Sequence, residues 1–186
     1  MRPQSKTEIT RRRVSYRCRW SVVNAELGAG EWTLDTTVTS IGFQAKGAFG
    51  MKVNGRFDRY ESSITVGAAV ADSAISALIW TDSVDTGIKM RDEHLMADNV
   101  FATARFPTLE FRSTVLVETP TGLKVTGTLR IRDVSQSVTF HATRSTTMGR
   151  PRYNATVVVA PKEYGVTRLG TTKPVKVILD ATLKRA

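Results

Sequence analysis

The residues of this chain that could do chemistry gather in one short stretch, Arg91-Asp92-Glu93-His94. A metal site built on several histidines is excluded, because His141 is the only other histidine in the sequence. Asp92, Glu93 and His94 are consecutive, so one ion shared by all three would require an unusual loop. We therefore expect no metal ion, and we interpret His94 as a hydrogen-bonding turn residue.

Enzymatic chemistry has little support elsewhere in the chain. A serine nucleophile would be marked by G-x-S-x-G, and bound phosphate by a glycine-rich loop, and the sequence contains neither motif. A Ser-His-Asp triad assembled from distant positions stays open, whereas nothing supports Asp85 with Asp92 as an acid–base pair. We expect no catalytic residues, no enzyme activity and no cofactor.

Charge is concentrated at the start of the sequence. The formal net charge is +10, and residues 1–20 hold seven of the 27 basic residues but one of the 17 acidic ones. Later signs are interspersed, without the basic stripe and exposed aromatics of single-strand nucleic-acid binders. We predict a basic, flexible extension over residues 1–28, which could contact an anionic membrane surface or another polyanion.

The same segment bears on location. A secretory signal needs an apolar run of about 7–15 residues after its basic start, but here Val14-Ser15-Tyr16 leads into Arg17-Cys18-Arg19. We expect a cytoplasmic location, and no apolar run is long enough for a membrane-spanning helix. Cys18 is the single cysteine, so no internal disulfide can form.

From about residue 31 onward, apolar residues alternate with polar ones. Leu123, Val125, Gly127 and Leu129, for example, alternate with lysine, threonine and arginine. This period of two indicates antiparallel strands with one solvated face. Similar runs occur near residues 32–34, 41–45, 53–57, 64–66, 75–79, 109–117, 138–140, 157–159 and 175–183.

Two segments do not follow the alternation. The stretch 45–51 is rich in small residues and is compatible with a short helix or an irregular bend, and 91–104 has helical spacing. With so little helix, about eight one-sided strands must either close into a barrel or stack as a sandwich. Inward-facing Gly127 and Ser113 favour the barrel, because they would leave space inside.

The order and spacing of several motifs resemble the YceI-like family over residues 32–183. A lysine–histidine pair often found after the family's first strand is here Lys46-Gly47, so any role of that histidine is lost. The motifs that carry the resemblance are Trp32-Thr33-Leu34-Asp35, Ser40-Ile41-Gly42-Phe43, 49–57, Ser83-Val84-Asp85-Thr86-Gly87, Arg91-Asp92 with His94-Leu95, Pro107 with Phe111 and Ser113, Val125 with Gly127 and Leu129, and Tyr164-Gly165-Val166.

The resemblance implies an extended, lipocalin-like barrel over residues 29–186, with one or two short helices. It also implies bacterial origin and an isoprenoid-type lipid, such as a polyprenol or an isoprenoid quinone, carried or sequestered inside. Arg91, Asp92 and His94 would then lie near one end of the cavity and order the short helix. The expected lining residues are Phe43, Phe57, Ile64, Ile79, Leu109, Phe111, Val125 and Leu129.

Other interpretations stay open. The runner-up is a ligand-free β-domain that acts in an assembly, with the basic extension engaging an anionic partner. An enzyme acting on a lipid-like substrate in the cavity ranks third. Trp80 falls on the polar side of its strand, which suggests a rim or a homodimer contact.

Overall fold

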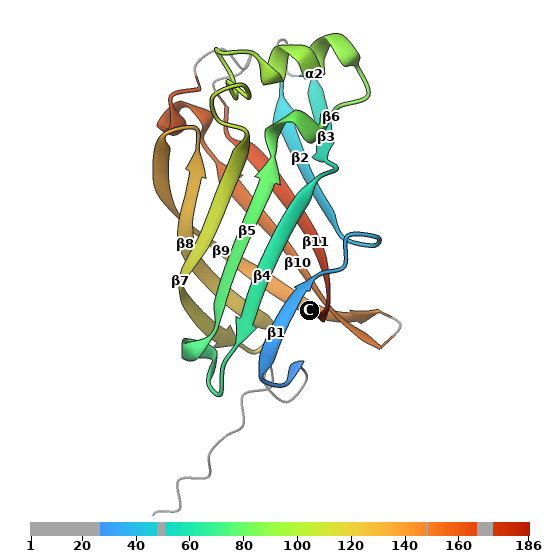
Figure 1. Ribbon diagram of the computed structural model, residues 1–186, viewed down its shortest axis with the longest axis vertical. Coiled ribbons are helices and arrows are strands. Elements are labelled where there is room, and N and C mark those ends of the chain that lie inside the picture. Colours follow the sequence, from blue (N-terminus) through green and yellow to red (C-terminus); the bar gives the residue numbers. More distant parts are fainter. Residues whose placement is uncertain (1–26, 48–50, 148, 167–172) are drawn as a thin grey trace, which may run out of the picture.

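The computed structural model describes residues 27–47, 51–147, 149–166 and 173–186 as an antiparallel β-barrel (Figure 1). The predicted all-β, lipocalin-like barrel is confirmed. Within the described residues, eleven strands form a single sheet, and eight of them close into a ring. The predicted number of about eight barrel strands is therefore correct.

The strands and helical segments follow one another with short connections. In chain order they are β1 (Gly30–Leu34), β2 (Ser40–Lys46), β3 (Lys52–Phe57), β4 (Tyr60–Val66), η2 (Val70–Asp72), β5 (Ala74–Trp80), η3 (Thr81–Ser83), β6 (Val84–Asp85), α2 (Lys89–Met96), β7 (Thr108–Thr119), β8 (Gly122–Ile131), β9 (Val134–Thr147), β10 (Arg150–Val159), η4 (Pro161–Tyr164) and β11 (Val175–Arg185).

The ring runs β1-β4-β5-β7-β8-β9-β10-β11 and closes where β11 pairs with β1. Strands β2, β3 and β6 branch from it, because β2 also pairs with β11. The first half of β11, Lys176 to Asp180, pairs with β2, and the end of the strand, Leu183 to Arg185, pairs with β1. One edge of β11 therefore serves two strands in succession.

The turn between β1 and β2 hydrogen-bonds to β11 at the point where β11 changes its partner from β2 to β1; we call this point the seam. The N–H of Asp35 donates to the carbonyl of Thr182 at 2.8 Å, and the hydroxyl of Thr39 accepts from the N–H of Thr182 at 3.1 Å. Buried backbone groups need such partners. The seam thus completes the hydrogen bonding of β11 at the residue between its two partner strands.

Asp35 itself is buried in this seam, although it carries a charge. Its carboxylate accepts from the hydroxyl of Thr37 at 2.8 Å and from the guanidinium of Arg150 at 2.6 Å. Only 8% of its side chain is exposed. A buried carboxylate is tolerated when it is paired and hydrogen-bonded, as this one is.

Two clusters of buried side chains lie in the barrel. The lower cluster includes Leu27, Trp32, Leu116 and Leu183, and the upper cluster, at the α2 end, includes Leu95. Leu34, Phe140 and Leu179 pack against both clusters. The barrel interior is therefore apolar along its whole length.

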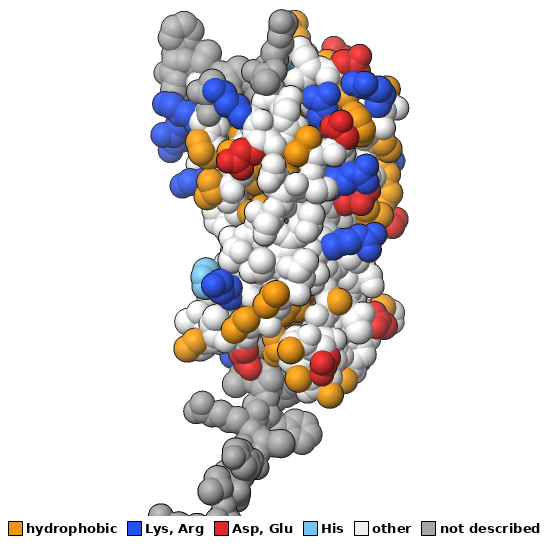
Figure 2. Space-filling model, turned by 90° about the vertical axis from the view of Figure 1, so that its left-hand side faces the viewer, with side chains coloured by type: hydrophobic (Ala, Val, Ile, Leu, Met, Phe, Trp, Pro, Cys, Tyr) orange, Lys and Arg blue, Asp and Glu red, His pale blue; other side chains and the backbone are white. Residues whose placement is uncertain are grey.

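The outer wall is mostly polar, as the alternation predicts. The prediction is wrong for Val115 and Val117, which are exposed, because the register shift after Ser113 in the β7–β8 ladder turns Leu116 inward instead. Over β8 and β9, for example, the hydroxyls of half-buried Thr126 and exposed Thr139 lie 3.0 Å apart on the outer surface. Figure 2 shows one face of the barrel, on which basic and acidic side chains are interspersed. This face has no continuous basic stripe.

Some boundaries differ from the sequence-based predictions. Strand β2 extends to Lys46, so the predicted bend does not begin at Ala45, and residues 48–50 lie outside the described residues. The helical spacing after residue 90 is realised only by α2, which starts at Lys89 and ends at Met96. Trp80 is half-buried beneath the guanidinium of Arg59, which lies 5.0 Å from its ring.

The predicted basic extension, residues 1–28, also ends too late. Leu27 is buried at 5% exposure, and its carbonyl accepts from the guanidinium of Arg185 at 3.2 Å. Leu27 and Gly28 therefore belong to the packed barrel. The rest of the predicted extension, 1–26, lies outside the described residues.

We predict that Asp35 makes the stability of the barrel depend on pH. Hydrogen bonds from the hydroxyl and N–H of Thr37, with the nearby charges of Lys184 and Arg150, hold the pKa of the Asp35 carboxyl below its ordinary value of 3.8. Folding therefore favours the carboxylate, and this stability is fully present above the unfolded pKa and is lost as pH falls through the lowered folded pKa.

Asp35→Asn should accordingly lower the urea midpoint at pH 7 and weaken its dependence on acid below about pH 4. Asp82→Asn, which removes an exposed pair with Arg59, is the matched control and should lower the pH 7 midpoint less. Equal effects of the two substitutions would show that the seam does not depend on Asp35.

Candidate functional site

A cavity of about 540 Å³ runs along the inside of the barrel. Its wall is made by the inward-facing residues of the strands, from Leu27 and Val66 at the lower end to Leu95 and Met51 at the α2 end. The two buried clusters both contribute to this wall. The space is within the size range of small-molecule sites, about 300–1,000 Å³.

All of the lining residues expected from the sequence lie on the cavity wall. They come from six different strands and face inward because each occupies the apolar phase of its alternation. Their contact with a ligand stays a prediction. These residues are Phe43, Phe57, Ile64, Ile79, Leu109, Phe111, Val125 and Leu129.

The cavity wall also contains residues that were not predicted to line it. Phe140 and Leu179 follow the same period-two pattern in β9 and β11, so the sequence did contain the signal for them. Leu95 and Phe101 come from α2 and the loop after it. Strand periodicity carries no information about those two positions.

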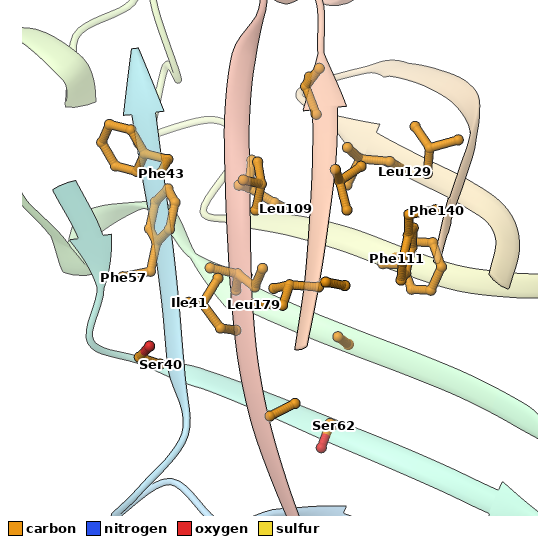
Figure 3. Close-up of a pocket in the computed structure, with 18 of the residues that line it drawn as sticks. Ser40, Ile41, Phe43, Phe57, Ser62, Leu109, Phe111, Leu129, Phe140 and Leu179 are labelled. Carbon is orange, nitrogen blue, oxygen red and sulfur yellow. The ribbon is translucent and has the colours of Figure 1, made fainter. Parts of the chain in front are cut away.

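Phenylalanine rings form two groups along the cavity (Figure 3). At the α2 end, the ring centres of Phe43 and Phe57 are 5.6 Å apart, and Phe101 lies 6.0 Å from Phe57. Further along the barrel, Phe111 and Phe140 are 5.8 Å apart. These tilted pairs give the wall a rigid, apolar surface.

Glycines on the neighbouring strands make room for these rings. A Cβ added at Gly55 would lie 2.3 Å from the Phe43 ring, and one at Gly127 would lie 2.6 Å from the Phe111 ring. The space left by Gly127 is therefore filled by Phe111 and does not add to the cavity. Ser113 does not open space either, because its hydroxyl accepts from the N–H of Ile75 at 2.8 Å.

Gly127 and Ser113 therefore do not explain the cavity, although the sequence analysis used them to favour a barrel over a sandwich. Gly127 leaves room for the ring of Phe111. Ser113 accepts a hydrogen bond from the N–H of Ile75 at the start of β5, next to the register shift in the β7–β8 ladder.

Few polar side chains face the cavity, and several of them are engaged by the wall itself. The hydroxyl of Ser62 accepts from the N–H of Leu34 at 2.9 Å, and the hydroxyl of Thr39 bonds to the Thr182 backbone. Figure 3 shows Ser40 and Ser62 apart from the phenylalanine groups. Among the residues that the structure describes, the middle of the cavity therefore has no cluster of polar groups suited to orient a polar ligand.

The charged turn lies at the α2 end, as expected. Arg91 and His94 line the cavity, whereas Asp92 does not. The Asp92 carboxylate accepts from the N–H and hydroxyl of Thr86 at 2.9 and 2.5 Å. Arg91 donates to the hydroxyl and carbonyl of Thr86 at 2.8 and 2.7 Å.

This network compensates for a weak helix. α2 has only eight residues and no side-chain cap at its first residue, and an isolated helix of that length is unstable in water. Arg91 and Asp92 tie its first turn to Thr86, directly after β6. The geometry thus agrees with the expected helix-ordering role of these two residues, which stays a prediction.

The described part of the chain offers neither a metal site nor a membrane-spanning helix. No group of three or more histidine, cysteine, aspartate or glutamate side chains is arranged there to hold a metal ion. Nor does that part contain a helix long and apolar enough to cross a membrane.

Residues 32–183 match the family model of the YceI-like domain. A UPF0312 protein of Shewanella denitrificans is 33% identical over 120 residues, which are 62% of this chain and 63% of that protein. The chain thus spans less than two thirds of the length of the curated relatives it matches.

Solved structures share the fold at lower identity. Burkholderia cenocepacia BcnA superposes with a TM-score of 0.72 at 16% identity, covering 81% of this chain and 99% of that one. A polyisoprenoid binding domain from Saccharophagus degradans, implicated in plant cell wall breakdown, superposes with a TM-score of 0.65 at 17% identity, covering 83% and 98%.

We predict that Gly55 is required to accommodate the Phe43 ring. Gly55→Ala should cost about 1–3 kcal/mol of unfolding free energy, because its Cβ would overlap that ring and Thr86. Gly42→Ala is the control, since its Cβ would meet nothing closer than 3.5 Å. Adding Phe43→Leu should recover part of the loss in a double-mutant cycle of urea unfolding, and purely additive costs would contradict the steric explanation.

We further predict that Asp92 anchors α2. Asp92→Ala leaves the N–H and hydroxyl of Thr86 without their acceptor, which should cost about 1–3 kcal/mol and speed amide exchange in α2. Glu93→Ala is the control, because Glu93 is exposed and makes one loose 3.9 Å pair with Lys89. If amide exchange in α2 were as slow in Asp92→Ala as in the parent, the helix would have to be held by its apolar contacts alone.

Proposed function

Because this chain belongs to the YceI-like family, whose domain spans residues 32–183, we propose that it binds an isoprenoid-type lipid inside its barrel without chemically changing it. The observation that carries the proposal is the long, apolar cavity. A carrier or sequestering role for a polyprenol or an isoprenoid quinone follows from such a site.

The energetics support this ligand class. Each 100 Å² of isoprenoid surface moved from water into an apolar cavity stabilises the complex by about 2.5 kcal/mol. Such a ligand needs few hydrogen-bonding partners. The hydroxyls of Ser62 and Thr39 already accept hydrogen bonds from backbone N–H groups, so they are not required for a ligand. The polar group of the lipid would lie near Arg91 and His94 at the α2 end.

The structural neighbour from Saccharophagus degradans supports the same ligand class, since it is described as a polyisoprenoid binding domain. At 17% identity this likeness concerns the fold, so the individual contacts must be argued from this chain. The phenylalanine pairs at both levels of the cavity, Phe43 with Phe57 and Phe111 with Phe140, are the natural contacts for isoprene units.

The direct test is native mass spectrometry of protein purified without detergent, followed by solvent extraction of any bound compound. We expect one apolar molecule per barrel, or uptake of one after incubation with polyprenols and isoprenoid quinones. Protein that stays free of lipid under both conditions would contradict the proposal. It would also favour the alternative in which the basic extension engages an anionic partner.

A matched pair of variants locates binding in the cavity. Ala77 of β5 lines the cavity, whereas the next residue, Leu78, does not. Ala77→Trp should reduce lipid uptake at least tenfold by filling the space, and Leu78→Trp should leave uptake near the parent value. Unfolding midpoints confirm that both variants fold, and equal uptake by both would place the lipid elsewhere.

A further inference from the structure

Exposed apolar side chains lie at the α2 end of the barrel. Met51 lines the cavity and is 64% exposed, and Ile88 and Met90 at the start of α2 are 53% and 80% exposed. Met90 does not line the cavity, but it lies one helical turn before His94, which does. Figure 1 shows α2 beside the ends of β2 and β3. We call Met51, Ile88 and Met90 the apolar rim.

A pair of lysines stands directly beside this rim. Lys46 and Lys52 oppose each other in the β2–β3 ladder, next to Met51, and both are exposed. Like charges in directly opposed positions destabilise a sheet. Across the residues that the structure describes, neither lysine forms an ion pair that would offset the repulsion.

Positive charge continues into the neighbouring strand. Exposed Lys176 of β11 pairs with Gln44, which in turn opposes Asn54 of β3. The described ends of β2, β3 and β11 at the α2 end of the barrel contain lysines and no acidic residue. An anion placed there would relieve a repulsion that the isolated protein retains.

The combination of charge and apolar surface selects the partner. A soluble polyanion such as a nucleic acid would satisfy the lysines but leave the methionines in water. A bilayer with anionic headgroups offers phosphates to Lys46 and Lys52 and, a few ångströms deeper, hydrocarbon to Met51 and Met90.

We propose that the α2 end of the barrel docks on an anionic phospholipid bilayer through the lysine pair and the apolar rim, so that the cavity opens onto the membrane. The inference rests on the proposed lipid-binding function and adds where the lipid enters. An isoprenoid chain could then pass from bilayer to cavity without exposing its apolar surface to water.

The test is sedimentation of the full-length protein with vesicles of phosphatidylcholine containing about one third phosphatidylglycerol. Each lysine near an anionic surface contributes about a fivefold increase in binding, so Lys46→Gln with Lys52→Gln should weaken binding about 25-fold. Met90→Ser, which changes an exposed residue outside the cavity wall, should weaken it severalfold.

The control removes the same charge elsewhere on the barrel. Lys124→Gln with Lys184→Gln changes two exposed lysines that lie away from α2 and outside the cavity wall. This double variant should bind the vesicles nearly as well as the parent. A third variant lacking residues 1–24 should retain the vesicle binding that is due to the lysine pair.

Three results would overturn the inference. Equal losses in both double variants would indicate nonspecific attraction, and loss only on removing residues 1–24 would assign binding to the basic extension. A changed oligomeric state with unchanged vesicle binding would assign the rim to a second copy of the chain.

Uptake of a polyprenol added from ethanol, without vesicles, separates this inference from the proposed function. Normal uptake by all variants, with vesicle binding lost in Lys46→Gln/Lys52→Gln, is the supporting result. Failure of the parent protein to take up polyprenol would overturn the proposed function and, with it, the route of entry.

Discussion

The structure depends on closing a β-sheet completely around a space that its side chains do not fill. Every buried backbone N–H and C=O of a closed barrel needs a hydrogen-bond partner. This is hardest to achieve on β11, because one edge of that strand pairs first with β2 and then with β1. The turn at Asp35 and Thr39 supplies the hydrogen bonds of Thr182 at this point. A buried carboxylate is the consequence, and Thr37 and Arg150 compensate for it.

Once the wall is closed, its interior can remain open because packing is concentrated elsewhere. The two buried clusters stabilise the barrel, while glycine–phenylalanine contacts across strands pack the wall itself. Gly55 and Gly127 allow the rings of Phe43 and Phe111 to approach the backbone of the neighbouring strand closely. The cavity is therefore bounded by well-packed aromatic side chains and remains large enough for an apolar ligand.

The two ends of the barrel differ in character. At the lower end, Leu27 and Trp32 are buried, and the guanidinium of Arg185 donates to the Leu27 carbonyl and lies 4.4 Å from the centre of the Trp32 ring. At the other end lies the short helix α2, which is tied to Thr86, and Met51 and Met90 are exposed there. Under the proposed function, this asymmetry favours the α2 end as the place where a lipid would enter from a membrane surface.

The sequence by itself determined which residues face inward in most strands, and thereby the eight predicted positions of the cavity wall, whereas the choice of a barrel over a sandwich came from the resemblance to the YceI-like family. Alternation is a local property of strands, so Phe43 or Leu129 can be assigned without knowing their neighbours. Tertiary structure decided the rest. The ring that covers Gly127, the seam at Thr182, the approach of Phe101 to Phe57 and the opposition of Lys46 and Lys52 all depend on strand register and on long-range packing, which a one-dimensional pattern does not contain.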